Sequence, residues 1–166
     1  PAVNMAVVQK TEPRIIPLNL FQTWYTLDLL PKMKEIVELL KKQNPEFTHY
    51  LYDDKMCRDF IREHFHEDIL WAFDKLKPGA YKADLWRYCV LYIHGGIYLD
   101  IKMKPVNNFK LIQLTDQEYF PKDRFCDNIH GIWQGLLVCL PHNIILHKSI
   151  MLTCQNVKNN FYGPSA

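Results

Sequence analysis

The run from Ala83 to Lys102 carries the side chains best suited to bind a charged ligand. Asp84 and Arg87 are separated by about one helical turn, so a helix would present both on one face. Asp100 stands at the end of the strand predicted to follow, and ligands in open α/β sheets bind beyond the carboxyl ends of the strands. A carboxylate there can hold Mg²⁺ or Mn²⁺, and an arginine can hold phosphate or sugar oxygens with two aligned donors. These residues therefore suit a nucleoside diphosphate with its cation.

Gly95 and Gly96 lie between the two parts of this run. Glycine lets the chain turn tightly and lets a ligand come close to the backbone. From spacing alone a simpler interpretation stays open, in which Asp84 and Arg87 form a pair on a helix surface and Gly95 ends that helix.

The hydrophobic pattern predicts alternating strands and helices around this run. Strands are expected at 15–21, 47–52, 97–101 and 133–140, and helices at 31–44, 53–65, 69–76, 80–93 and 143–157. The first helix begins at Pro31 and stops before Pro45, because the residue before a proline disfavours the helical conformation. Asp53 or Asp54 is expected to cap the second helix, with a ligand pair as the alternative. The alternation indicates an α/β sheet in a single domain, 14–166, with a loose leader at 1–13 and a loop at 115–128.

The charge balance and the hydrophobic pattern argue against nucleic-acid binding and against a membrane span. The chain of 166 residues has 20 basic and 18 acidic side chains, a net charge of +2, which does not favour nucleic acid. No apolar stretch is long enough to span a membrane, and the start of the sequence has no signal-peptide pattern.

Five cysteines are widely spaced along the chain: Cys57, Cys89, Cys126, Cys139 and Cys154. No pair has the close spacing of a zinc site, so we expect reduced thiols and a cytoplasmic protein. The alternative is the Golgi lumen, if an anchor has been removed from the N-terminus.

Two segments together resemble the core of the family 32 glycosyltransferases, which have a DxD-type sugar-binding region. The first, Pro78–Tyr88, contains Ala-Asp-x-x-Arg, and the second, Gly95–Asp100, reads Gly-Gly-x-Tyr-x-Asp. Either pattern alone is weak, but their combination is specific. The segments ending at Trp24 and at Asp54 are also similar, so the resemblance spans roughly 14–164. The family includes fungal initiating mannosyltransferases with bacterial and viral relatives.

The resemblance implies a GT-A fold, a Rossmann-like α/β domain with a mixed, mostly parallel sheet and flanking helices. It implies transfer of a hexose from a UDP-sugar or GDP-sugar to a hydroxyl of a glycan, protein or lipid, with retention of configuration. Asp84 and Arg87 would hold the donor sugar and phosphate, Tyr98 would lie near the nucleotide, and Asp100 would face the ribose and bind Mn²⁺ or Mg²⁺. The base pocket would be lined by four consecutive residues: Phe21, Gln22, Thr23 and Trp24.

The sequence departs from the family at Lys102, where the family's Asp-x-Asp motif has its second carboxylate. An ammonium has no lone pair for a metal. Lys102 either neutralises the phosphates itself, so that metal is weakly held or unneeded, or it points away and the metal relies on Asp100. The chain also stops at Ala166, before the family's usual tail, and we therefore expect an incomplete domain.

The sequence is also compatible with two other functions. A non-catalytic module that binds a sugar nucleotide or glycan would explain the altered motif. A metal-dependent phosphoesterase built on Asp84 and Asp100 is weaker, because two-metal sites need more carboxylates.

Overall fold

A four-stranded sheet with strand order β2-β1-β3-β4 forms the centre of the protein. The strands are β1 (Asn19–Thr23), β2 (Thr48–Tyr52), β3 (Gly96–Leu99) and β4 (Leu136–Cys139). β1 pairs in parallel with both β2 and β3, whereas β4 runs antiparallel to β3. The carboxyl ends of three strands therefore share one edge with the start of β4. The computed structural model describes residues 14–77, 79–123 and 131–161, so the expected leader lies outside it.

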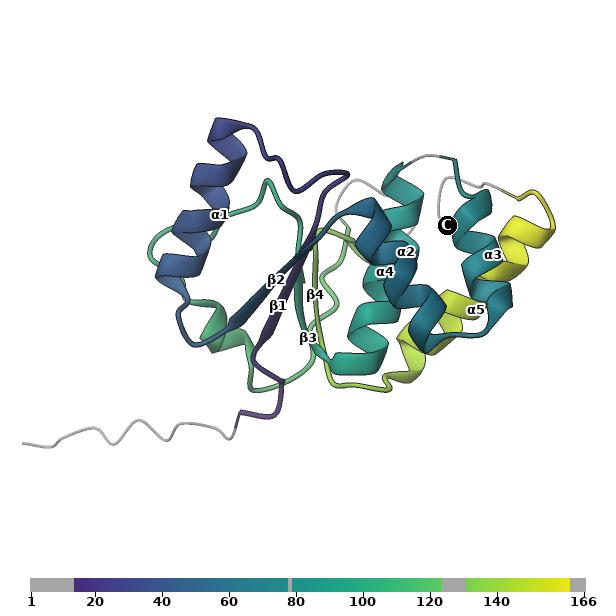
Figure 1. Ribbon diagram of the computed structural model, residues 1–166. Coiled ribbons are helices and arrows are strands. Elements are labelled where there is room, and N and C mark those ends of the chain that lie inside the picture. The colour runs from purple at the N-terminus through teal and green to yellow at the C-terminus, as the bar shows by residue number, and fades with distance from the viewer. Residues whose placement is uncertain (1–13, 78, 124–130, 162–166) are drawn as a thin grey trace, which may run out of the picture.

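The helices lie in two layers on opposite sides of this sheet (Figure 1). α1 (Pro31–Gln43) covers one side. The other side carries α2 (Asp54–His64), α3 (Glu67–Lys75), α4 (Gly79–His94) and α5 (Ile144–Lys158). This mixed, mostly parallel sheet between helices confirms the predicted α/β class. None of the helices in the described ranges is long and apolar enough to cross a membrane.

Two hydrophobic clusters form because successive side chains of a strand point to opposite faces. Phe21 and Tyr98 face α4 and belong to the larger cluster, which also contains the fully buried Trp86. Leu20 and Ile97 face the other way, into a cluster closed by α1 and the short helix η1 (Leu111–Leu114). The sheet thereby separates the two layers.

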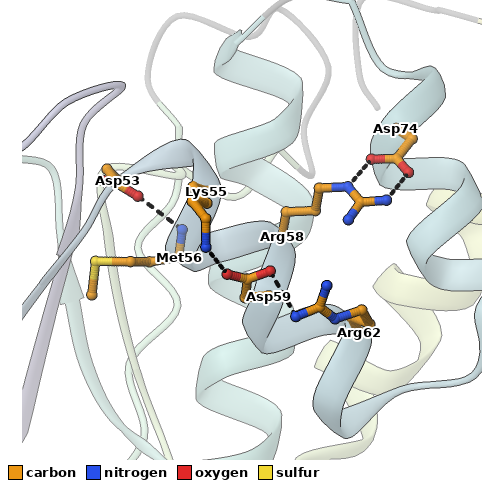
Figure 2. A network of polar contacts seen from close by, with 7 residues as sticks. All are labelled: Asp53, Lys55, Met56, Arg58, Asp59, Arg62 and Asp74. Atoms are coloured by element: carbon orange, nitrogen blue, oxygen red, sulfur yellow. Dashed lines mark hydrogen bonds and ion pairs between the residues drawn. The ribbon is translucent and has the colours of Figure 1, made fainter.

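α2 is fixed in place by polar contacts on its outer surface (Figure 2). The Asp53 carboxylate accepts the Met56 amide at 2.8 Å, which caps the helix and confirms one of the two predicted caps. Arg58 donates two hydrogen bonds of 2.8 Å to Asp74 of α3. These contacts tie the helix that follows β2 to its neighbour.

Gly95 and Gly96 connect α4 to β3 in a turn that only glycine accommodates well. Their φ angles are 60° and 120°, in the region that L side chains rarely adopt. A Cβ at Gly96 would lie 2.6 Å from the Asn19 carbonyl oxygen. The pair sits at the amino end of β3, whereas Asp100 follows its carboxyl end. The expectation that a ligand approaches these glycines is therefore wrong, and they serve the turn and the packing against β1.

Some boundaries differ from the predicted ones for reasons visible in the contacts. β1 begins at Asn19 rather than at 15, because the Ile15 and Ile16 amides both donate to the Thr115 carbonyl. η1 was not predicted, and the expected loop at 115–128 includes Tyr119, which pairs with Val138 at the sheet.

Candidate functional site

A cavity of about 400 Å³ opens at the carboxyl edge of the sheet. The end of β1, the start of α2, the start of α4 and the turn after β3 all contribute to it. Its lining consists of Thr23, Trp24, Tyr25, Asp54, Gly79, Ala80, Ala83, Arg87, Tyr98, Asp100, Ile101 and Lys102. Six of these residues were candidates from the sequence, which predicted this edge as the ligand site.

Arg87 brings a buried positive charge to the cavity. The residue is 5% exposed, and its guanidinium lies 4.4 Å from the centre of the Tyr98 ring. Its Nη2 forms an ion pair of 2.7 Å with Asp84, and its Nη1 donates to the Gln134 carbonyl. Nε donates to the Ala83 carbonyl, so each guanidinium nitrogen has a partner and the group is held in one orientation.

Asp100 lies in the turn after β3 and is oriented by a neighbour on that strand. The Tyr98 hydroxyl donates to Asp100 Oδ1 at 2.8 Å. Burial, opposed by Arg87, raises the pKa of Tyr98, so the phenol stays protonated and keeps donating. The Asp100 amide donates to the Gly135 carbonyl, which holds the turn against the start of β4.

Asp84 does not line the cavity but contacts Arg87, which does. Its carboxylate pairs with Arg87 as the sequence spacing predicts, and it borders a small hollow with Tyr81 and Tyr88. Burial raises the pKa of Asp84, and Asp100 adds to this while Arg87 opposes it. A direct grip of Asp84 on a donor sugar stays a prediction.

The first-strand residues divide between the cavity and the core. Thr23 and Trp24 line the cavity. Phe21 does not, because its side chain stacks on Tyr50 inside the larger cluster. Gln22 does not either, because alternation along β1 turns it to the opposite face, where it is fully buried. Neither residue is placed where it could form the expected base pocket.

Gln22 instead supports the turn that carries Asp100. Its Nε2 donates to the Leu99 carbonyl at 3.2 Å, and its Oε1 lies 2.9 Å from His49 Nε2. Burial, with a smaller contribution from Lys41, lowers the pKa of His49 to about 4, so the ring is neutral at pH 7 and supplies the hydrogen that Gln22 Oε1 accepts. The polar link connects β2, β1 and β3 at the edge below the cavity.

Lys102 faces the cavity from the turn after Asp100. Its ammonium lies 5.0 Å from the centre of the Trp24 ring. Within 14–77, 79–123 and 131–161, no carboxylate forms an ion pair with it. The side chain therefore does not turn away from the site, which removes one of the two alternatives left by the sequence.

The side chains at this site do not fit a divalent cation held by the protein. Among the described residues, no three His, Cys, Asp or Glu side chains come together in a way that could hold a metal. Lys102 occupies the position of the motif's second carboxylate, and Asp100 Oδ1 already accepts the Tyr98 hydroxyl. Asp54 is the other carboxylate of this lining, so the described part of the cavity offers two carboxylates, and no cluster of three, for the metal role expected of Asp100.

Sequence reasoning missed one contributor to the site. The Gln134 carbonyl fixes Arg87, but a backbone oxygen from a distant segment leaves no sequence signal. Asp54 lines the cavity while its neighbour Asp53 caps α2. The cap is thus confirmed at Asp53, and a ligand role for Asp54 stays a prediction.

Comparisons with known proteins show the family and the fold of the chain. Residues 31–121, more than half of the chain, match the family described as glycosyltransferase sugar-binding region containing DXD motif. The solved PaToxG glycosyltransferase has a similar fold, with a TM-score of 0.66 over 91% of this chain and 65% of that chain, at 15% identity.

Curated relatives come from a virus and from fungi. An uncharacterized glycosyltransferase of Acanthamoeba polyphaga mimivirus is 32% identical over 71% of this chain and 49% of its own length. Inositol phosphoceramide mannosyltransferase 2 of Schizosaccharomyces pombe is 31% identical over 88% of this chain and 39% of its length. The initiation-specific alpha-1,6-mannosyltransferase of Candida albicans is 30% identical over 59% of this chain and 28% of its length. The chain thus spans less than half the length of these relatives, and it belongs to the family of glycosyltransferases whose sugar-binding region contains the DXD motif.

Proposed function

We propose that the chain transfers a hexose from a nucleoside diphosphate sugar to an acceptor hydroxyl, with retention of the anomeric configuration. The observation that carries this proposal is the cavity at the carboxyl edge, where Arg87, Asp100 and Lys102 meet the indole of Trp24. An aromatic face can stack a base, and cationic side chains suit a diphosphate. Two relatives are named as mannosyltransferases, which favours mannose as the first sugar to test.

The mechanism follows from charges that are fixed before the donor arrives. The guanidinium of Arg87 is held by Asp84 and by the Gln134 carbonyl, so it needs no reorganisation as negative charge develops on the departing diphosphate. Asp100, oriented by Tyr98, has Oδ2 available to accept a hydroxyl of the ribose or sugar. The acceptor hydroxyl approaches the sugar face from which the diphosphate leaves, and its correct positioning supplies much of the rate. Its oxygen bonds to the anomeric carbon as the bond from that carbon to the diphosphate oxygen breaks, and its proton passes to the departing diphosphate.

A second candidate function is binding without transfer. It is favoured by Lys102, because a carboxylate-to-ammonium change at the motif alters the charge beside a diphosphate by two units. In this case the cavity would hold a sugar nucleotide and release it intact.

The two candidates are separated by a turnover assay. The chain is incubated with UDP-glucose or GDP-mannose and methyl mannoside, with and without Mn²⁺, and release of the nucleoside diphosphate is measured. Transfer predicts release that Asp100→Asn abolishes, with a product whose anomeric proton matches that of the donor. Binding without release across the panel supports the second candidate, and an inverted product contradicts retention.

A further inference from the structure

We propose that the ammonium of Lys102 holds the diphosphate in place of a divalent cation, so that nucleotide binding by this chain is independent of metal. This inference rests on the proposed function, because it concerns the same ligand in the same cavity. It departs from what the family motif implies.

The distribution of charge in the cavity supports this assignment. Arg87 is the other basic residue of the lining, and its charge is paired with Asp84 at 2.7 Å. Lys102 has no such partner among the described residues, so its full charge is available to a ligand. An ammonium is a compact point charge with three donors, which is a common way for proteins to bind phosphate.

The position of the ammonium also suits this role. It lies 5.0 Å from the centre of the Trp24 ring, on the lining of the cavity. A cation over an aromatic ring at an exposed site is held only weakly. The ammonium can therefore leave the ring for a phosphate when a nucleotide enters.

The same residues are poorly suited to a cation. A magnesium or manganese ion takes oxygen ligands, and Lys102 offers none at the position where the motif has a carboxylate. The remaining carboxylate of the motif, Asp100, already receives the Tyr98 hydroxyl on one oxygen. A divalent ion in this turn would also meet the positive charge of Lys102.

Calorimetric titration with UDP and GDP tests the inference directly. Each nucleotide is titrated into the chain in EDTA and again in excess Mn²⁺. We expect the Kd of the preferred nucleotide to differ by less than about threefold between the two conditions, well under the tenfold that corresponds to losing one strong charged contact. Binding that requires Mn²⁺ overturns the inference and leaves the proposed function intact. Failure of both nucleotides to bind under either condition overturns both proposals.

Three variants of exposed lysines sharpen the test. Lys102→Met removes the charge at similar length and should weaken binding in EDTA by about 10- to 100-fold, with no gain from Mn²⁺. Lys102→Asp restores the Asp-x-Asp pattern and should bind weakly in EDTA but at least about tenfold more tightly with Mn²⁺. Lys104→Met is the matched control, because Lys104 borders a different hollow and its loss should change nothing. A Lys102→Met chain that binds like the wild type in EDTA contradicts the inference.

Discussion

Arg87 is a buried cation whose neighbours account for its position. A carboxylate, two backbone carbonyls and an aromatic ring surround it. Lysine could satisfy only part of this arrangement, because its single ammonium cannot replace a planar fork of donors. A substitution by lysine would therefore keep the positive charge at position 87 but lose the fixed orientation of the donors.

Arg87→Lys should lower both stability and turnover while keeping the charge. We expect a loss of about 2–4 kcal/mol in the free energy of unfolding, because Asp84 and the Gln134 carbonyl lose well-placed donors in a buried site. Turnover should fall by about 100-fold or more, as for other fixed donors to a developing charge. Urea unfolding and nucleotide release measure the two effects. Arg62→Lys, at an exposed ion pair with Asp59, is the control and should change neither.

The pH dependence of stability should report the burial of Asp84. Its pKa is raised in the folded chain, chiefly by burial, so the folded state binds a proton before the unfolded state does as the pH falls. The cost of burying the ionised form is therefore present at neutral pH and disappears as the pH falls through the raised pKa towards the ordinary value near about 3.9.

Asp84→Asn removes the pH-dependent contribution of the Asp84 carboxyl to the free energy of unfolding, so comparison with the wild type measures that contribution. Relative to the wild type, the variant should be at its most stable near about pH 7 and should lose this relative advantage as the pH falls towards about 4. Urea unfolding of both chains across this range tests it. The opposite trend would mean that the pair with Arg87 outweighs burial and lowers the pKa.

Several of these residues could be predicted because their signal is local. Helical spacing brings Asp84 and Arg87 together, and the end of a strand locates Asp100. Phe21 and Gln22 could not be assigned correctly, because which face of β1 meets the cavity depends on how the helices pack.

The turn between α4 and β3 is the element on which the site most depends. It sets where β3 starts, and β3 carries Tyr98 and delivers Asp100 to the opposite edge. The glycine pair was predicted from the sequence, but its role was not, because only the topology places it at the far end of the strand.

Gly96→Ala should destabilise the fold by about 2–4 kcal/mol. The new Cβ would lie 2.6 Å from the Asn19 carbonyl oxygen, and the φ of 120° is itself unfavourable for alanine. Thermal and urea unfolding measure the loss. Gly79→Ala is a suitable control, because no atom lies within 4 Å of its added Cβ, and its effect should lie between zero and a gain of about 1 kcal/mol. Equal stability of the two variants would contradict the account of the turn.

Over the whole molecule, the sequence order of strands and helices was sufficient to predict the class of fold. Periodicity and prolines located the five α-helices. The sequence pattern could not predict η1 or the antiparallel direction of β4, since both depend on contacts between distant segments. The chain spans less than half the length of the curated relatives it matches.

The thiols provide a measure of whether the whole chain folds as described. Cys57, Cys89, Cys139 and Cys154 are all buried and free. Burial is the main cause that raises the pKa of Cys57 and of Cys139 to about 12, so both remain protonated and unreactive near neutral pH. In a Cys126→Ser background, labelling by iodoacetamide should be slow in buffer and should rise together with unfolding in urea. Rapid native labelling of any of the four would contradict the packing of the core.

A nucleoside diphosphate sugar should bind at the carboxyl edge of the sheet. Hydrogen–deuterium exchange with and without a saturating nucleotide sugar tests its location most directly. We expect slower exchange in peptides that cover 23–25 and 100–102, with no change around Gly95 and Gly96. Protection confined to the separate hollow around 103–114, with none at 23–25 or 100–102, would contradict it.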